Sequence, residues 1–159
     1  MDLTTATLSR PRLADVAIAG GSWANTRTVD MQLRRGTFRG VRMTGVGFAS
    51  ASVQDVSFVE CRIDLSSFRF AKLARVRFER CQMEEIDFSS AQLQSVMFLD
   101  CVMVKSLWAE ATLTRCEMRG SDISGSGNPE RLRGLRMPWQ DVLAAAGELA
   151  AAVGIEIVE

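Results

Sequence analysis

The most reactive side chains in this sequence belong to four cysteines, three of which are evenly spaced. Cys61, Cys81 and Cys101 are twenty residues apart, and Cys116 follows. Thiols can form disulfides, bind zinc or act as nucleophiles. Zinc sites normally use Cys-x-x-Cys pairs or histidine partners, and the sequence has neither. We therefore expect no metal site and no cofactor, and we interpret the cysteines as small buried apolar residues.

Other residues with catalytic potential lack the surroundings that catalysis needs. The sequence has no histidine and no tyrosine. A phosphate-binding loop needs glycines between a strand and a helix, and no such context surrounds the glycines Gly36, Gly40, Gly45 and Gly47. An acid–base pair needs a pocket, and nothing predicts one beside the acidic group Asp64, Glu84, Glu85 and Asp87. We predict that the protein is not an enzyme and takes no small-molecule substrate.

The elements that carry these residues follow a five-residue period. From Leu3 to Ile123 every fifth residue is apolar except Thr28, and a small or apolar residue usually precedes each of these centres by two positions. Residues two apart in an extended chain face the same way, so each unit points two residues inward and three outward. An amphipathic helix would need spacings of three and four. The pattern predicts a short strand and a tight turn, repeated.

The same centres also repeat every twenty residues. One set of centres consists of Phe38, Phe58, Phe78 and Phe98. This longer period predicts a four-sided coil in which residues twenty apart stack at one strand spacing, ~4.8 Å. About six coils result, and the three evenly spaced cysteines stack within one side. Parallel strands aim stacked Cβ atoms the same way, so we expect free thiols rather than disulfides.

Several five-residue units resemble those of the pentapeptide-repeat family, whose unit is roughly Ala-(Asp/Asn)-Leu-x-x. The units are Ala-Lys-Leu-Ala-Arg from Ala71, Cys-Gln-Met-Glu-Glu from Cys81 and Ala-Gln-Leu-Gln-Ser from Ala91. The resemblance implies an all-β solenoid, a right-handed quadrilateral β-helix, over residues 1–125. Pro11, Gly21 and Thr28 depart from the pattern, so we expect an irregular first coil.

The repeat stops after Ile123. Residues 126–137 form a turn-rich connection, and residues 138–159 are expected to form a C-terminal helix with a short tail. Such a segment would cap the last coil, since an open sheet edge invites aggregation. The alternative, which the resemblance allows, is a dimerisation element that joins two copies. Without a secretory signal or a long apolar run, we expect a cytoplasmic protein that does not enter a membrane.

The charge balance bears on nucleic-acid partners. The chain has nineteen basic and nineteen acidic residues. Some pentapeptide-repeat proteins resemble B-DNA and protect DNA gyrase from quinolones, which requires a strongly acidic rod. Here that function is an alternative implied by the resemblance and not by the charge. We also expect no direct binding of nucleic acid, because arginines and acids interleave and Phe70 is the only outward aromatic residue.

One stretch of outward positions is unusually apolar. We call it the apolar belt, and it consists of Met97, Leu99, Val102, Val104 and Leu107. A contiguous apolar surface is typical of a contact site. Either the C-terminal helix folds over the belt or a partner binds there. The sequence therefore favours a non-enzymatic protein–protein interaction or scaffold module with an unknown protein partner. The alternatives are the gyrase-binding DNA mimic and a purely structural rod.

Overall fold

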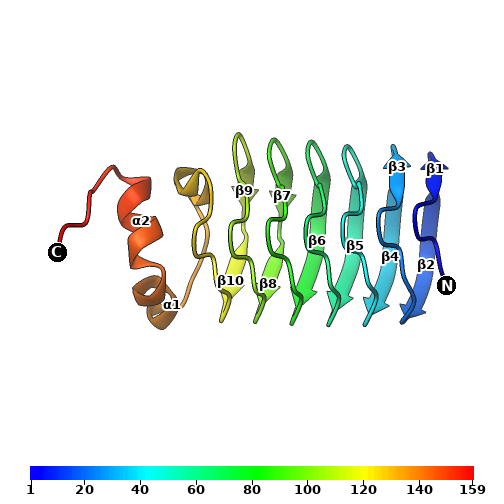
Figure 1. Cartoon of the computed structure of the whole chain (residues 1–159), viewed down its shortest axis with the longest axis horizontal. Coiled ribbons are helices and arrows are strands. Elements are labelled where there is room, and N and C mark those ends of the chain that lie inside the picture. The colour runs from blue at the N-terminus through cyan, green and yellow to red at the C-terminus, as the bar shows by residue number, and fades with distance from the viewer.

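The chain forms a parallel β-solenoid with short helices at its C-terminal end (Figure 1). The structure is a computed structural model that describes residues 1–159. Its strands are β1 (Thr7–Ser9), β2 (Arg12–Ala19), β3 (Arg27–Val29), β4 (Gln32–Arg39), β5 (Ser52–Val59), β6 (Lys72–Glu79), β7 (Gln92–Gln94), β8 (Met97–Leu99), β9 (Thr112–Thr114) and β10 (Glu117–Arg119). The all-β solenoid predicted from the repeat is confirmed.

Neighbouring coils are joined in a constant register of twenty residues. Phe58 pairs with Phe78 and Phe78 with Phe98, and isolated bridges such as Arg62↔Gln82 keep the same offset. Six full coils cover residues 1–120, and a partial seventh follows. We number the four sides in chain order, so that sides 1 to 4 of the fourth coil are residues 61–65, 66–70, 71–75 and 76–80. Most strands lie on sides 3 and 4.

A left-handed residue ends each side of every coil. All residues at positions divisible by five, from Thr5 to Gly125, have positive φ angles, including the bulky Leu65 at 59° and Phe70 at 58°. Each side consists of four extended or turn residues, and the left-handed residue that follows them turns the chain onto the next side. The period of five in the sequence is therefore the spacing of the corners.

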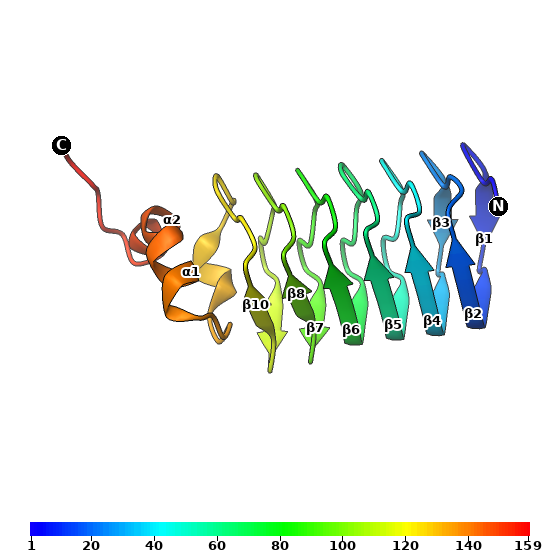
Figure 2. The same cartoon turned by 90° about the horizontal axis from the view of Figure 1, so that it is seen from below.

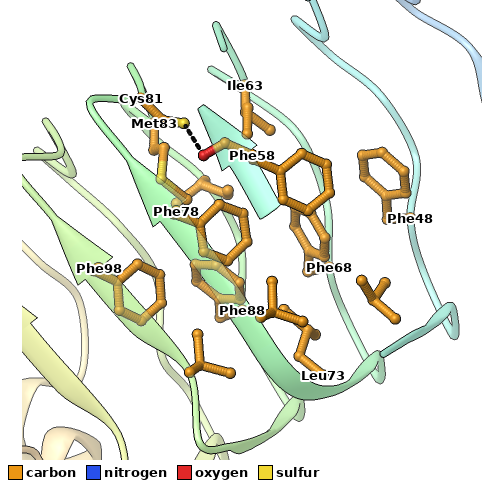
Figure 3. Packing of buried hydrophobic residues seen from close by; sticks show 14 of the residues in the cluster. Phe48, Phe58, Ile63, Phe68, Leu73, Phe78, Cys81, Met83, Phe88 and Phe98 are labelled. Carbon is orange, nitrogen blue, oxygen red and sulfur yellow. Dashed lines mark hydrogen bonds between the residues drawn. The ribbon is translucent and has the colours of Figure 1, made fainter. Parts of the chain in front are cut away.

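Two stacks of aromatic rings fill the interior (Figure 3). In one stack, the ring centroid of Phe78 lies 5.0 Å from Phe58 and 5.3 Å from Phe98. The other stack runs from Phe48 to Trp108, and the two meet edge to face. All these rings are buried. Each additional coil therefore extends one continuous core, as expected of a solenoid.

The cysteines lie in the core as free thiols. The Sγ atom of Cys81 donates to the carbonyl oxygen of Phe58 at 3.3 Å (Figure 3), and Cys61 and Cys101 make the equivalent bond one coil before and after. Their expected burial is confirmed. Burial raises the pKa of the Cys116 thiol, because it penalises the charged thiolate.

The first coil keeps the register despite its unusual residues, which differs from the irregular coil expected above. β1 pairs with β3, and β2 pairs with β4, at the same offset of twenty. Thr28 is buried, and its hydroxyl is satisfied there because it donates to the carbonyl oxygen of Gly47 at 2.7 Å. At Gly21, an added Cβ would lie 2.1 Å from the Met1 carbonyl oxygen. The departures at Gly21 and Thr28 thus have local structural reasons.

The C-terminal segment forms two helices where one was expected. A 3₁₀ helix, η1 (Pro129–Leu132), precedes α1 (Trp139–Ala144) and α2 (Ala146–Ala152), and Ala145 interrupts the helical run. Figure 2 shows both α-helices beyond β10, across the end of the rod. Ala145 is buried, and Leu135, Met137 and Leu149 pack against the core. The carboxylate of Asp141 accepts a bond from the backbone N–H of Gly120. The segment therefore covers the last coil.

Candidate contact surface

The interior leaves no room for a ligand, so any partner must meet the outside of the rod. The four rings of the stack from Phe38 to Phe98 are fully buried. An open groove on side 1 is lined by mixed charges, among them Arg62, Asp64 and Glu84. No group of three or more histidine, cysteine or acidic side chains is placed to hold a metal ion.

The apolar belt predicted from the sequence is a narrow line. Met97 and Leu99 lie on side 4, Val102 and Val104 on side 1, and Leu107 on side 2. Only Leu107 is exposed, at 43%, and the other four are half-buried.

Charged neighbours lie on both sides of the two belt residues on side 4. Met97 is aligned with Arg77 and Glu117, and Leu99 with Glu79 and Arg119, on the coils before and after. The ion pairs Arg77–Glu79 and Arg119–Glu117 therefore flank Met97 and Leu99 on both sides and account for their burial. The helices lie beyond β10, at the end of the rod, and not over the belt (Figure 1).

A more exposed apolar group lies on side 2. Apart from Met1, the large apolar side chains exposed on the coils all lie on this side or at its corners. We call them the side-2 apolar group, which consists of Val29, Leu65, Phe70 and Leu107. Leu65 and Phe70 end sides 1 and 2 of the fourth coil and are 59% and 58% exposed. Side 2 and its corners thus carry the exposed large apolar side chains of the coils, apart from Met1.

The remainder of side 2 is flat and close to neutral. Small residues occupy most of its outward positions between the apolar side chains, namely Gly47, Ala49, Ser67, Ser89 and Ala109. Arg69 forms an ion pair with Asp87 at 3.5 Å, and its guanidinium lies 5.9 Å from the Phe70 ring centroid. A surface of balanced charge with a few protruding apolar residues resembles part of a protein interface.

Charge pairs between coils occur on sides 3 and 4. Arg75 donates two hydrogen bonds to Asp55, at 2.6 and 3.1 Å, and Arg35 binds Asp15 in the same way. These guanidinium groups hold the pKa of Asp15 and Asp55 below the ordinary value of 3.8. On side 4, Glu60 binds both Arg39 and Arg80.

The acidic group seen in the sequence is not a separate negative patch. Asp64 pairs with Arg62 at 2.8 Å, and Asp87 pairs with Arg69. Of the four, only Glu84 and Glu85 lack a basic partner. The opposite charges on neighbouring positions neutralise much of the local field.

The sequence contains the signal for the side-2 apolar group, because its members occupy outward positions of the twenty-residue register. Of its members, only Leu107 belonged to the predicted belt. The sequence predicts Phe70 as an outward aromatic residue, but no prediction from the sequence includes Val29 or Leu65. Comparing outward positions twenty residues apart along every side would have found all four, because the register is constant.

The fold and its five-residue corners define a class of protein, the β-solenoids built from pentapeptide units. Residues 12–88 match the family model described as the pentapeptide repeat region. The chain is thus a pentapeptide-repeat protein. None of its helices is long and apolar enough to cross a membrane.

Solved structures of other repeat proteins have similar architecture at low sequence identity. Full-length QnrB1, a plasmid-mediated fluoroquinolone resistance protein, is 13% identical; the alignment covers 94% of this chain and 100% of QnrB1, with a TM-score of 0.34. Rfr23 from the cyanobacterium Cyanothece 51142 is 11% identical over 87% of this chain and 88% of its own, with a TM-score of 0.32. No curated protein matches the chain in sequence. At these TM-scores the similarities identify no function.

Proposed function

We propose that this pentapeptide-repeat protein is a non-enzymatic protein–protein interaction module that binds its partner through side 2. The observation that carries the proposal is the gathering of Val29, Leu65, Phe70 and Leu107 on one flat side. Protein interfaces concentrate their binding energy in a few apolar or aromatic anchors surrounded by less energetic contacts. The partner is accordingly a protein with a complementary apolar, weakly charged surface.

The backbone at two of these residues supports a binding role. Leu65 and Phe70 occupy left-handed corners, a conformation that costs most side chains ~1–2 kcal/mol. Glycine or asparagine would relieve that cost, and a polar residue would interact better with water. Because most of their apolar surface lies outside the core, we expect these bulky residues to contribute in a complex and not to the fold.

The thiols support a cytoplasmic location. All four cysteines are free, which suits a reducing compartment.

The experiment compares captured proteins between matched variants. The tagged protein and the double variant Leu65→Asn/Phe70→Asn are used to capture partners from native cytoplasm, with quantitative mass spectrometry as the readout. The control is Ser95→Asn, which changes a left-handed corner on side 3. We expect a small set of proteins retained by the control and lost with the double variant. Equal capture by all three proteins would contradict binding through side 2, and no specific capture would favour the structural rod.

The charge distribution does not support DNA mimicry. Eight of the fourteen acidic residues up to Gly125 pair with arginines, namely Asp15, Asp55, Glu60, Asp64, Glu79, Asp87, Glu110 and Glu117. Gyrase binds the dense negative charge of DNA, which this surface does not reproduce. We therefore predict no effect of micromolar protein on gyrase supercoiling, with or without a quinolone. Protection of supercoiling from the quinolone would contradict this prediction.

A second copy of the chain is the alternative partner. On α1, Trp139 and Leu143 are exposed although the helix covers the rod end. Light scattering of the intact protein and of the variant Trp139→Gln/Leu143→Gln distinguishes this case. A dimer of the intact protein that is lost in the variant would place the contact on α1 instead of side 2.

A further inference from the structure

Positive charge is concentrated on side 3 of the solenoid. This side carries six exposed cations and two carboxylates; the cations are Arg12, Arg34, Arg35, Lys72, Arg75 and Arg115. Sides 2 and 4 carry equal numbers of basic and acidic residues, and side 1, on the opposite face, carries three cations and five carboxylates. The balanced total charge of the chain therefore conceals an unequal distribution between opposite sides.

Four of the side-3 cations have no acidic partner. Both carboxylates of the side, Asp15 and Asp55, are already bound by Arg35 and Arg75. Arg12, Arg34, Lys72 and Arg115 form no ion pair with any acidic side chain within 4.0 Å. They remain available for an anionic partner.

The strands hold these cations on a flat and rigid surface. β2, β4, β5, β6, β7 and β9 pair in one constant register along the side. Arg12 lies on the first coil and Arg115 on the sixth, so the cations extend over five strand spacings, ~24 Å. The positions between them are mainly polar, with amides and hydroxyls such as Gln92, Gln94 and Thr112.

These side chains fit phosphates better than they fit a protein. A protein interface needs apolar anchors, and no large apolar side chain is exposed within side 3, since Phe70 lies at its border with side 2. Contacts to a nucleic-acid backbone come instead from arginine, lysine, glutamine, serine and threonine. The side has no aromatic residue on which unpaired bases could stack. A rigid flat surface of this composition suits a duplex, whose phosphates are regularly spaced.

We propose that side 3 binds the phosphate backbone of duplex nucleic acid, independently of sequence. This goes beyond the protein contact proposed for side 2, and the two sites lie on adjacent sides of the rod. It also differs from the sequence-based expectation of no nucleic-acid binding, because four of the cations on side 3 are not neutralised by the acids that interleave with them in the sequence. Four neutralised phosphates predict a slope of log affinity against log salt of about −3.6.

Fluorescence anisotropy with a labelled 24-base-pair DNA of mixed sequence tests the proposal, starting at low salt. The variant Arg34→Gln/Lys72→Gln removes two unpaired cations from side 3. Its control is Arg27→Gln/Arg42→Gln, which removes two cations without ion-pair partners from sides 2 and 1 and changes the net charge equally. We expect weaker binding and a slope near −1.8 for the side-3 variant only. Thermal melts check folding, and Arg12→Gln/Arg115→Gln repeats the test if the first variant is destabilised.

Four results would overturn the proposal: absence of duplex binding at low salt, equal weakening by the control, preference for a single-stranded oligonucleotide of the same length, or tighter binding to phosphatidylserine vesicles. Leu65→Asn/Phe70→Asn should keep duplex binding, which separates this site from the one on side 2.

Discussion

Leu65 and Phe70 lie five residues apart at the two corners of one solenoid side, both in the left-handed conformation and both more than half exposed. Neither side chain contributes its apolar surface to the core. We predict that Leu65→Asn/Phe70→Asn leaves the free energy of unfolding unchanged or raises it by up to about 1 kcal/mol, because asparagine tolerates this conformation. Chemical denaturation measures the difference. A loss of stability above 1 kcal/mol would mean that the two residues serve the fold.

Phe78 points into the core of the solenoid, whereas Phe70 points outward from a corner. Phe78 is buried between Phe58 and Phe98, so Phe78→Ala should cost about 3–5 kcal/mol through lost packing and a cavity. Phe70→Ala should change the free energy of unfolding by less than about 0.5 kcal/mol. Similar melting temperatures for the two variants would contradict the assigned register.

The ion pair between Asp55 and Arg75 predicts a stability change in acid. The pKa of Asp55 is lowered in the folded protein, so its stabilising effect is present above the ordinary pKa of 3.8 and disappears as the pH falls below it. Asp55→Asn and Arg75→Gln should each reduce the pH dependence of the unfolding midpoint in this range, and the double variant should add little. Full additivity of the two substitutions would show that the side chains do not interact.

The buried cysteines predict that all four thiols react only after unfolding. Each thiol is enclosed in the core, and burial raises the pKa of Cys116, which lowers the fraction of reactive thiolate. Titration with a thiol reagent should give no rapid reaction in the native protein. Without reductant, the denatured protein should show four thiols. Fewer than four would reveal a disulfide, and rapid native reaction would place a thiol on the surface.

The interior could be predicted from the sequence because the repeat acts on it directly. Centres such as Phe58 and Phe78 must fill one continuous core, so their chemistry recurs every twenty residues. The outer residues are not constrained in this way, and the belt at Met97 and Leu99 looked more accessible than it is. The burial of Met97 and Leu99 depends on ion pairs formed by long side chains within the coils before and after them, such as Arg77 with Glu79. Side-chain conformation of that kind is not encoded in a periodic pattern.

The ends of the solenoid show a second limit. The sequence located the C-terminal segment, but the break at Ala145 between α1 and α2 depends on how the segment fits the last coil. Similarly, Gly21 appeared to be a defect, whereas it accommodates the close approach of Met1. Contacts between distant or terminal residues decide both features.

Binding through side 2 is tested most directly by photo-crosslinking within that side. A photoreactive amino acid replaces Ser67, which lies between Leu65 and Phe70, and in a second protein it replaces Gln54 on side 3. After irradiation in native cytoplasm, adducts are separated by mass. We predict protein adducts from position 67 that Phe70→Asn abolishes, and none of the same adducts from position 54. Adducts from position 54 alone, or adducts from position 67 that persist with Phe70→Asn, would contradict the proposed contact surface.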